Sequence, residues 1–472
     1  MADANLARAA EESLARLGDH ESLWFDGRWL RSGDLHDRAA RLASGLQERG
    51  VEPGDRVVVQ MPNCPEVGIA YQAIWRAGGV VTPALFLLPT AELEHIADDS
   101  GAKVVLAAPE ECVELEQHEP GEIVPRNAAD PAALLYTGGT TGRSKGVVLS
   151  HENLWFAGKS GHDSGHVPGL VRGLSALPLA HSYGLLVTVV GLHAEEQTQA
   201  VLMRWFDPEV FLQLAQEHRT QITAVVPSML QLLLAQPLED YDLSELRYVV
   251  SGGAPLPRDV AGEVLRRLPQ VELREGYGLT ETAALVSSTP PGESRLGSVG
   301  KPAPGVEVRI EGDDEVGEIC VRSRSVMLGY WNDPELSADT MVDGWLRTGD
   351  LGYLDDDGYL YVVDRKKDLI IRGGFNVFPS DVEEALLEHP AIAAAGVVGR
   401  PDEVHGEEVV AFVELRSGED IGAEEIVAWS KEKIGGYKYP REVHVVRSVP
   451  LTPVGKVDRK ALRTKVLEEA PA

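Results

Sequence analysis

The chain has 472 residues, of which 43% are hydrophobic and 25% charged, and its formal net charge is −30. This length exceeds one ordinary hydrophobic core, so two or three domains are expected. The negative charge argues against a nucleic acid or an anionic membrane as a partner, because binding phosphate groups requires clustered Lys and Arg side chains. We expect instead a solvated acidic surface.

The three cysteines, Cys64, Cys112 and Cys320, are far apart, and no two of them have the spacing of a metal site or a redox motif. This usage fits a reducing, cytoplasmic compartment. Residues 1–22 contain acidic side chains and lack the apolar stretch of a signal peptide. No later segment sustains about 18 apolar residues, so no membrane span is expected.

The first hundred residues alternate between helical and extended patterns. Apolar residues recur at helical spacing over residues 34–50, behind Asp34 as the expected N-cap. The expected elements that follow are strands at 57–59, 80–81 and 104–107 and helices at 65–76 and 91–99. This alternation predicts a layered α/β domain with largely buried strands.

The same pattern continues beyond an aperiodic, acidic connection at residues 116–130, which we expect at the surface. Strands are expected at 222–226 and 248–250, with a helix at 229–235 between them. Past about Lys366 the pattern becomes that of a small α+β domain, in which Ser380 and Glu383 form an expected capping box and apolar runs follow at 391–398 and 409–415. We therefore predict an N-terminal domain of residues 1–366 and a C-terminal domain of residues 367–472.

A glycine- and threonine-rich loop, YTGGTTGRSKG at residues 136–146, follows an apolar run. Its glycines allow tight turns that direct backbone N–H groups toward an anion. The hydroxyls of Thr137, Thr140 and Thr141 add donors, and Lys145 adds a positive charge. The pattern predicts a polyphosphate cradle, although a merely flexible loop is an alternative. It does not meet the Walker A rule, so an ordinary P-loop is not expected.

This loop resembles the signature of the adenylate-forming superfamily, which includes acyl-CoA synthetases, luciferases and peptide-synthetase adenylation domains. Further motifs follow in the order of that family: LPLAH at 177–181, SGGAPL at 251–256, YGLTE at 277–281, GWLRTGD at 344–350, DRKKD at 364–368 and GK at 455–456. The resemblance covers nearly the whole chain. It implies a large layered α/β N-terminal domain and a small mobile α+β C-terminal domain.

The resemblance assigns most of these motifs to ATP and Mg²⁺. Thr280 would donate to the α-phosphate, and Glu281 together with Thr140 would hold Mg²⁺, a hard cation that prefers oxygen ligands. Tyr277 would present its ring to adenine, although a plain turn at the end of a strand is an alternative. The remaining expected contacts to the nucleotide are Gly138, Gly139, Gly142, Gly252, Gly253, Ala254, Gly276 and Gly278.

Two further positions are expected at the ribose. Asp350 can accept from both ribose hydroxyls, because one carboxylate takes two O–H donors, and Arg365 would act on the same side. Taken alone, Thr348-Gly349-Asp350 has the composition of an ordinary turn.

The resemblance also implies a catalytic lysine and a moving domain. Lys456 would reach the α-phosphate and the attacking carboxylate together, offsetting charge that develops at phosphorus. Lys367 would act as the hinge, with a solvated charge run as the alternative. After rotation, Gly373 and Gly374 would face the thiol of coenzyme A, and Lys438 would supply positive charge.

The acid that would be activated is indicated less directly. His181 matches the family's histidine beside the carboxylate, although it could be a satisfied core histidine. Gly138 and Asp364 depart from the more usual residues in a way that resembles some fatty acyl-CoA synthetases. Gly276 stands where malonate-activating relatives carry arginine. The region after LPL lacks the aspartate that pairs with an α-amine, so an apolar monocarboxylate is favoured over a dicarboxylate or an amino acid.

The expected reaction makes acyl-AMP from a carboxylic acid and ATP and then transfers the acyl group to coenzyme A. One alternative acceptor is the phosphopantetheine arm of a carrier protein, and another is an amine. A catalytically silent nucleotide-binding protein is disfavoured because Lys145, Glu281, Asp350 and Lys456 are all present. The protein could be a monomer or a homodimer.

Overall fold

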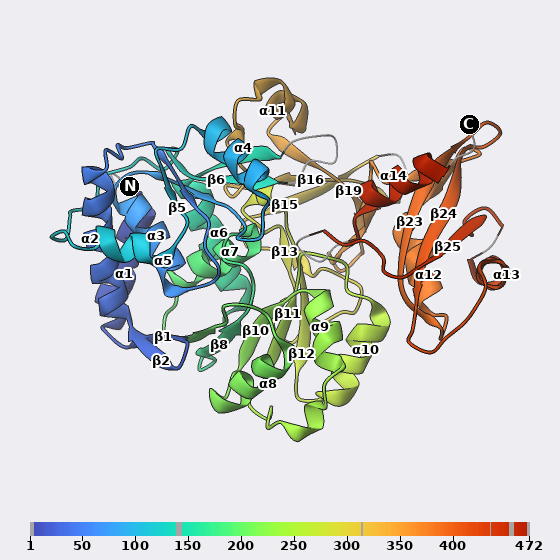
Figure 1. Cartoon of the computed structure of the whole chain (residues 1–472), viewed down its shortest axis with the longest axis horizontal. Coiled ribbons are helices and arrows are strands. Elements are labelled where there is room, and N and C mark those ends of the chain that lie inside the picture. Colours follow the sequence, from blue (N-terminus) through green and yellow to red (C-terminus); the bar gives the residue numbers. More distant parts are fainter. Residues whose placement is uncertain (1–3, 138–143, 313–314, 435, 453–456, 470–472) are drawn as a thin grey trace. The chain divides into compact units, whose positions relative to one another are not determined.

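The computed structural model describes residues 4–137, 144–312, 315–434, 436–452 and 457–469. The chain forms two compact units (Figure 1). The larger comprises Met1–Val308, Val321–Arg347 and Asp356–Leu360, and the smaller comprises Arg309–Cys320, Thr348–Asp355 and Tyr361–Ala472. The expected fold class, α/β with a large N-terminal and a small C-terminal part, is confirmed. A functional boundary between residues 366 and 367 stays a prediction.

The first sheet of the larger unit has the strand order β17-β7-β6-β4-β3-β5. Its strands are β3 Arg56–Val59, β4 Val80–Pro83, β5 Val104–Leu106, β6 Pro131–Thr137, β7 Lys145–Ser150 and β17 Gly329–Tyr330. The centre is parallel, whereas β6, β7 and β17 pair antiparallel. Val57, Val58 and Val59 are all buried, as expected for a strand covered on both faces.

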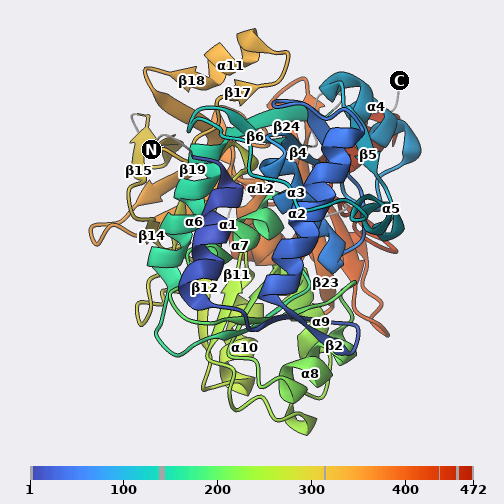
Figure 2. The same cartoon turned by 90° about the vertical axis from the view of Figure 1, so that its left-hand side faces the viewer.

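Helices cover this sheet. They are α1 Leu6–Leu17, α2 Ser32–Glu48, α3 Pro65–Arg76, α4 Thr90–Ser100 and α5 Pro109–Leu115. Helices α1, α2 and α3 contact one another (Figure 2). The buried Trp75 of α3 also donates its indole N–H to the carbonyl of Ala132 in β6, at 2.9 Å, so the helix is fixed to the sheet by a buried hydrogen bond as well as by apolar contact.

The second sheet has the strand order β14-β13-β12-β11-β10-β8-β9-β1-β2. Its strands are β1 Glu21–Phe25, β2 Arg28–Arg31, β8 Arg172–Ser175, β9 Gln199–Leu202, β10 Ile222–Val225, β11 Tyr248–Ser251, β12 Glu272–Tyr277, β13 Ser287–Ser288 and β14 Lys301–Pro302. Strands β10, β11 and β12 are parallel neighbours. Their carboxyl ends therefore meet at one edge, which is where ligands bind in open α/β sheets.

The helices of this region are α6 His151–Gly165, α7 Ser182–Gly191, α8 Pro208–Glu217, α9 Pro227–Leu234 and α10 Arg258–Arg267, with short 3-10 turns η1 Leu238–Asp240 and η2 Thr280–Thr282. Buried Leu and Val side chains of α8, α9 and α10 form one core with the strands. Figure 1 shows these helices beside β10, β11 and β12.

A third sheet orders its strands β15-β16-β19-β18, with β20 beside β19. The strands are β15 Glu307–Glu311, β16 Gly317–Arg322, β18 Met341–Val342, β19 Trp345–Leu354 and β20 Leu360–Arg365, and the helix α11 Pro334–Thr340 precedes β18. Over the described residues, no helix is both long and apolar enough to cross a bilayer.

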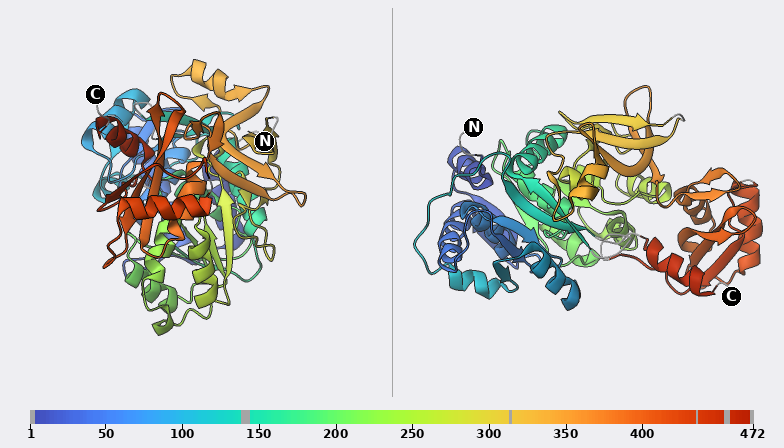
Figure 3. Two further views of the ribbon diagram at one scale, coloured as in Figure 1. Left: turned by 90° about the vertical axis from the view of Figure 1, so that its right-hand side faces the viewer. Right: turned by 90° about the horizontal axis from the view of Figure 1, so that it is seen from above.

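The C-terminal sheet has the order β22-β21-β24-β23, with β25 beside β24. Its elements are β21 Ile370–Arg372, β22 Phe375–Val377, β23 Ile392–Asp402, β24 Gly406–Leu415, β25 Glu442–Val446, α12 Pro379–Leu387, α13 Ala423–Ile434 and α14 Arg459–Glu469 (Figure 3). Alternate strand residues divide between two cores. Val397 and Val409 share a core with α12 and α13, whereas Val398, Val410 and Phe412 pack against Leu462 and Val466 of α14.

Both predicted helix caps are wrong in detail. Helix α2 begins at Ser32, with Arg31 at the N-cap, so Asp34 lies in its first turn, where a carboxylate favours the helix dipole. Helix α12 begins at Pro379, and its N-cap residue has no side-chain hydrogen bond. Instead the carboxylate of Asp364, 16 residues upstream, accepts hydrogen bonds from the backbone N–H and the hydroxyl of Ser380, each at 2.9 Å.

Glu275 is a largely buried carboxyl group on β12. Its described hydrogen-bond donor is the backbone N–H of Gly297, at 3.3 Å. Burial raises the pKa of Glu275 to about 7, and the hydrogen bond from Gly297 only partly opposes this shift. Ionisation of this group therefore costs the folded protein free energy as the pH rises.

The substitution Glu275→Gln is expected to stabilise the protein at pH 8 and to have little effect near pH 4.5. The unfolded chain releases this proton near pH 4.5 and the folded chain near pH 7, so the stability contribution of the native carboxyl falls across that window. The gain at pH 8 is on the order of 2 to 3 kcal/mol. Thermal unfolding midpoints at the two pH values would measure it.

Glu94→Gln, which changes an exposed glutamate in the middle of α4, is the control and should leave both midpoints unchanged. Equal stabilisation by Glu275→Gln at both pH values would contradict the assignment of a raised pKa.

Candidate active site

The glycine-rich loop joins two antiparallel strands. Thr137, the last residue of β6, lies opposite Lys145, the first residue of β7. A loop between two strands differs from the strand, loop and helix of a P-loop, in agreement with the sequence. The predicted phosphate-binding residues Gly138, Gly139, Thr140, Thr141 and Gly142 lie outside the described residues.

The loop that follows β11 approaches a tyrosine from another motif. A Cβ atom on Gly252 would lie 3.3 Å from Cε1 of Tyr183 and 3.5 Å from the carbonyl oxygen of Gly276. Gly253 has a φ of +82°, which favours glycine. Gly252 therefore lies against both the Tyr183 ring and the backbone of Gly276, which brings two of the predicted nucleotide contacts together.

His181 caps a helix as well as belonging to a motif. It is the N-cap residue of α7, and its Nδ1 accepts the backbone N–H of Tyr183 at 3.2 Å. An accepting Nδ1 places the ring proton of the neutral imidazole on Nε2. The next residue, Ser182, accepts a hydrogen bond from the hydroxyl of Thr280 at 3.3 Å. The residue that directly follows the LPLAH motif is therefore in contact with the YGLTE motif.

Gly278 is required by packing. A Cβ atom at this position would lie 2.1 Å from the carbonyl oxygen of Ala284, so no side chain fits without moving backbone. Ala283 and Ala284 have φ values of 50° and 65°, an uncommon conformation for residues other than glycine. The sharp return of the chain after η2 places Tyr277, Thr280 and Glu281 on one short segment, and such strain is typical of functional loops.

Glu281 has a partner that sequence reasoning missed. The hydroxyl of Tyr330 donates to Oε1 of Glu281 at 2.8 Å. The ammonium of Lys145 lies 5.8 Å from the centre of the Tyr330 ring. Tyr330 lies 49 residues beyond Glu281, in a strand of two residues. The nearby sequence pattern is Asp333-Pro334, which marks the start of the following helix and not the strand. No sequence pattern connects Tyr330 to Glu281.

The predicted ribose residues lie together in the smaller unit. Nε of Arg365 is 3.2 Å from Oδ1 of the buried Asp350. The backbone N–H of Asp350 is held by Oγ1 of Thr348, at 3.1 Å, and this hydroxyl donates to the carbonyl of Ile319 at 2.7 Å. The carboxylate of Asp350 is therefore fixed in position with its cationic neighbour beside it.

The residues predicted for the thiol step also lie in the smaller unit. Gly373 and Gly374, with φ values of +57° and +82°, form the two-residue turn between β21 and β22, as type I′ hairpins require. Lys438 is ion-paired with Asp381 at 2.7 Å, so its charge is already matched within the unit. Lys367, the predicted hinge, is exposed on the turn after β20.

The predicted catalytic lysine, Lys456, lies outside the described residues. The chain on either side of it is closed by a backbone bridge between Leu451 and Val457. The N–H of Asp458 also donates to the carbonyl of Pro450 at 2.8 Å. The described residues on the two sides of Lys456 are therefore held next to each other.

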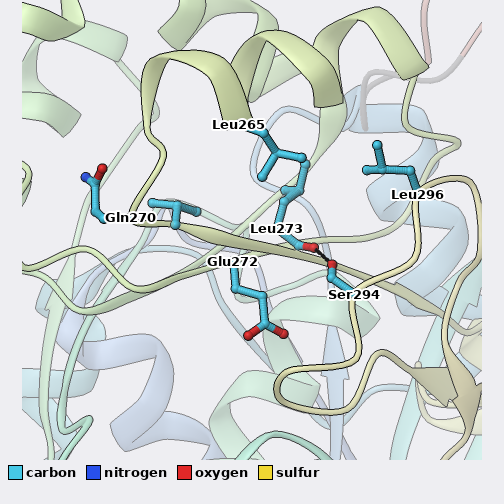
Figure 4. Close-up of a pocket in the computed structure, with 7 residues that line it drawn as sticks. Leu265, Gln270, Glu272, Leu273, Ser294 and Leu296 are labelled. Carbon is cyan, nitrogen blue, oxygen red and sulfur yellow. Dashed lines mark hydrogen bonds between the residues drawn. The ribbon is translucent and has the colours of Figure 1, made fainter.

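A surface pocket of about 360 Å³ lies elsewhere, between α10 and β12 (Figure 4). Its seven lining residues include none of the predicted site residues. Leu265, Leu273 and Leu296 make it largely apolar, and the hydroxyl of Ser294 is occupied by the carbonyl of Leu273. Its one carboxylate, that of Glu272, already accepts hydrogen bonds from Arg274 and from the backbone N–H of Gly292, and none of its lining residues is cationic.

Comparisons with known proteins agree with this geometry. The profile of the family described as AMP-binding enzyme matches residues 10–331, and that of the AMP-binding enzyme C-terminal domain matches residues 381–456. A feruloyl-CoA synthase from Amycolatopsis sp is 35% identical, covering 96% of this chain and 97% of the relative. A long-chain-fatty-acid–CoA ligase from Bacillus subtilis (strain 168) is 33% identical, covering 97% and 93%.

A similar solved structure is that of o-succinylbenzoate coenzyme A synthetase from Bacillus subtilis in complex with ATP and magnesium ion. It has a TM-score of 0.87 and 30% identity, and the match covers 97% of this chain and 99% of that one. Family profile, relatives and fold agree over nearly the whole length. The chain therefore belongs to the AMP-binding enzyme family and is an adenylate-forming acid–thiol ligase of the acyl-CoA synthetase type.

Proposed function

We propose that this protein activates an apolar monocarboxylic acid with ATP to form acyl-AMP and then transfers the acyl group to coenzyme A. The observation that supports the proposal most is the contact network that joins Ser182 to Thr280 and Glu281 to Tyr330, with Lys145 beside it. It brings groups suited to a carboxylate, a phosphate and a metal onto neighbouring loops of the larger unit.

In the adenylation step, the substrate carboxylate attacks the α-phosphorus of ATP and pyrophosphate leaves. The Thr280 hydroxyl turns from Ser182 to donate to the α-phosphate, and His181 orients the carboxylate through its protonated Nε2. Lys145 faces the departing phosphates, and Lys456 offsets the charge that develops at phosphorus. The remaining proposed phosphate-loop residues are Thr137, Gly138, Gly139, Thr140, Thr141 and Gly142.

Adenine and ribose use different residues. Tyr277, Gly252, Gly253, Ala254, Gly276 and Gly278 form the proposed adenine side. Asp350 accepts from the ribose hydroxyls, and Arg365 stands at 3.2 Å from it, where it can hold both the carboxylate and the sugar.

Glu281 is suited to Mg²⁺. Its Oε1 accepts from Tyr330, and no side chain in the described part of the chain donates to Oε2. A carboxylate oxygen is a ligand that Mg²⁺ prefers, and Thr140 is the proposed second ligand. When bound, Mg²⁺ supplies neutralisation of phosphate charge.

In the second step, a thiolate attacks the acyl carbonyl and AMP leaves. We propose that Lys367 is the hinge of this change and that Gly373 and Gly374 approach the pantetheine arm. Their lack of side chains permits close contact. Lys438 must leave its ion pair with Asp381 before it can bind a phosphate of coenzyme A.

An apolar acid is the proposed substrate class. Gly276 supplies no cation that could pair with a second carboxylate, and the aligned relatives are named for long-chain-fatty-acid and feruloyl substrates, both with apolar bodies. The two acids differ in shape, so the test compares straight-chain with aromatic acids. We expect a straight-chain acid to be preferred.

Purified protein with ATP and Mg²⁺ is expected to release pyrophosphate when given the correct acid and to form the matching acyl-CoA when coenzyme A is added. The acids to compare are straight-chain, branched and aromatic. Lys456→Ala should lower the release by roughly 10²- to 10³-fold, because a preorganised charge at the reacting phosphorus is lost.

Lys433→Ala is the matched control, since Lys433 pairs with Glu388 on the surface of α13, and it should retain full activity. Release without any thioester would indicate a carrier protein or an amine as the acceptor. No release with any acid would overturn the proposal.

Gly374→Ala is expected to slow formation of the thioester from synthetic acyl-AMP about tenfold and to leave pyrophosphate release unchanged. A φ of +82° strains alanine by on the order of 1 to 2 kcal/mol, and the turn would shift. Gly418→Ala changes a glycine with φ +89° in another turn of the same unit and serves as the control. Equal slowing of both half-reactions would refute a role specific to the thiol step.

A further inference from the structure

The segment Met327–Trp331 is tied to Glu281 and to β7 at several points. The backbone N–H of Met327 donates to the carbonyl of Glu281 at 2.8 Å. The N–H groups of Leu328 and Trp331 donate to the carbonyls of Val148 and Gly146 at 2.9 and 2.7 Å. The side chain of Tyr330 is therefore placed by backbone pairing on both sides of it.

This pairing fixes the register of Tyr330. Tyr330 lies opposite Val147, two residues beyond Lys145, which ends the glycine-rich loop. The ring of Tyr330 lies within reach of the Lys145 ammonium, at 5.8 Å, and its hydroxyl meets Glu281. One side chain thus contacts both the cation proposed for the phosphates and the carboxylate proposed for the metal.

The Tyr330 hydroxyl donates to one oxygen of the Glu281 carboxylate, Oε1, at 2.8 Å. Its proton occupies Oε1 of Glu281, which leaves Oε2 as the oxygen available to a metal.

We propose that Tyr330 is a positioning residue that holds the Glu281 carboxylate in the orientation required by the divalent cation that accompanies ATP. The inference rests on the proposed role of Glu281. Hydrogen bonds to metal-ligating carboxylates fix their orientation, and removing such a partner typically weakens metal binding by about 10- to 100-fold.

The test compares the binding of Mg·ATP and of AMP to the full-length protein by calorimetry, without acid or coenzyme A. Tyr330→Phe removes only the hydroxyl oxygen. It is expected to weaken Mg·ATP binding by about tenfold or more and to leave AMP binding unchanged, because AMP lacks the phosphates that the metal bridges. Damage to the nucleotide site as a whole would weaken both ligands alike.

Tyr359→Phe is the matched control. The hydroxyl of Tyr359 donates to the carboxylate of Glu293 at 3.2 Å, a tyrosine–glutamate pair of the same kind in the larger unit. This variant should bind both ligands as the wild type does. Thermal unfolding of each variant shows whether it folds.

Glu281→Gln tests whether Tyr330 acts through Glu281. In that background, Tyr330→Phe should cause no further loss of Mg·ATP affinity, as expected for two residues that act through one interaction. An additive loss would overturn the inference.

Two other outcomes are decisive. Mg·ATP affinity within twofold of the wild type in Tyr330→Phe, or an equal loss for AMP, would overturn the role of Tyr330 while leaving the proposed function intact. A wild-type protein that does not bind Mg·ATP would overturn both.

Discussion

The pairing of β7 on both of its sides is the constraint on which the candidate site depends. One side carries β6, so that Thr137 and Lys145 face each other across the ends of the glycine-rich loop. The other carries β17, which comes from a segment about 180 residues later in the chain. Backbone hydrogen bonds set this register, and a shift of one residue would turn every side chain of the pair to the opposite face. Lys145, Tyr330 and Glu281 meet because of it.

Local sequence patterns predicted the elements well where the controlling residues are neighbours. Pro65 begins α3 as a first-turn proline, and the predicted bounds 65–76 match the helix. The predicted capping box of α12 failed because Asp364, from β20, accepts the hydrogen bond of a backbone N–H at the helix N-terminus. A rule based on spacing within one helix does not detect a partner 16 residues away.

In the candidate site, too, the sequence predicted what depends on residues close together in the chain and missed what depends on distant ones. The motifs predicted the site residues, and the contact between Ser182 and Thr280 joins the end of the LPLAH motif to the YGLTE motif in space. Tyr330 was missed because its role depends on strand pairing, and two residues carry too little periodicity to signal a strand. Lys456 and the middle of the glycine-rich loop fall outside the described residues, so their placement stays a prediction.

A chain with a net charge of −30 must bind ATP against its own field. Three of the described cations near the motifs are already engaged: Arg365 with Asp350, Lys438 with Asp381, and Arg372 with Glu408. Such pairs hold the cations in fixed positions without adding net positive charge. Backbone N–H groups and a divalent metal would then carry much of the work of holding phosphate.

Helix α14, the last helix of the described chain, completes one core of the C-terminal unit. Helix α14 covers the face of the sheet formed by Val398, Val410 and Phe412, and it begins two residues after the bridge between Leu451 and Val457. A nonsense mutation or a protease cut that removed α14 would keep every motif residue but would uncover the buried face of Val398, Val410 and Phe412. A shortened protein could therefore retain the complete motif pattern and still lose one of the two cores of its C-terminal unit.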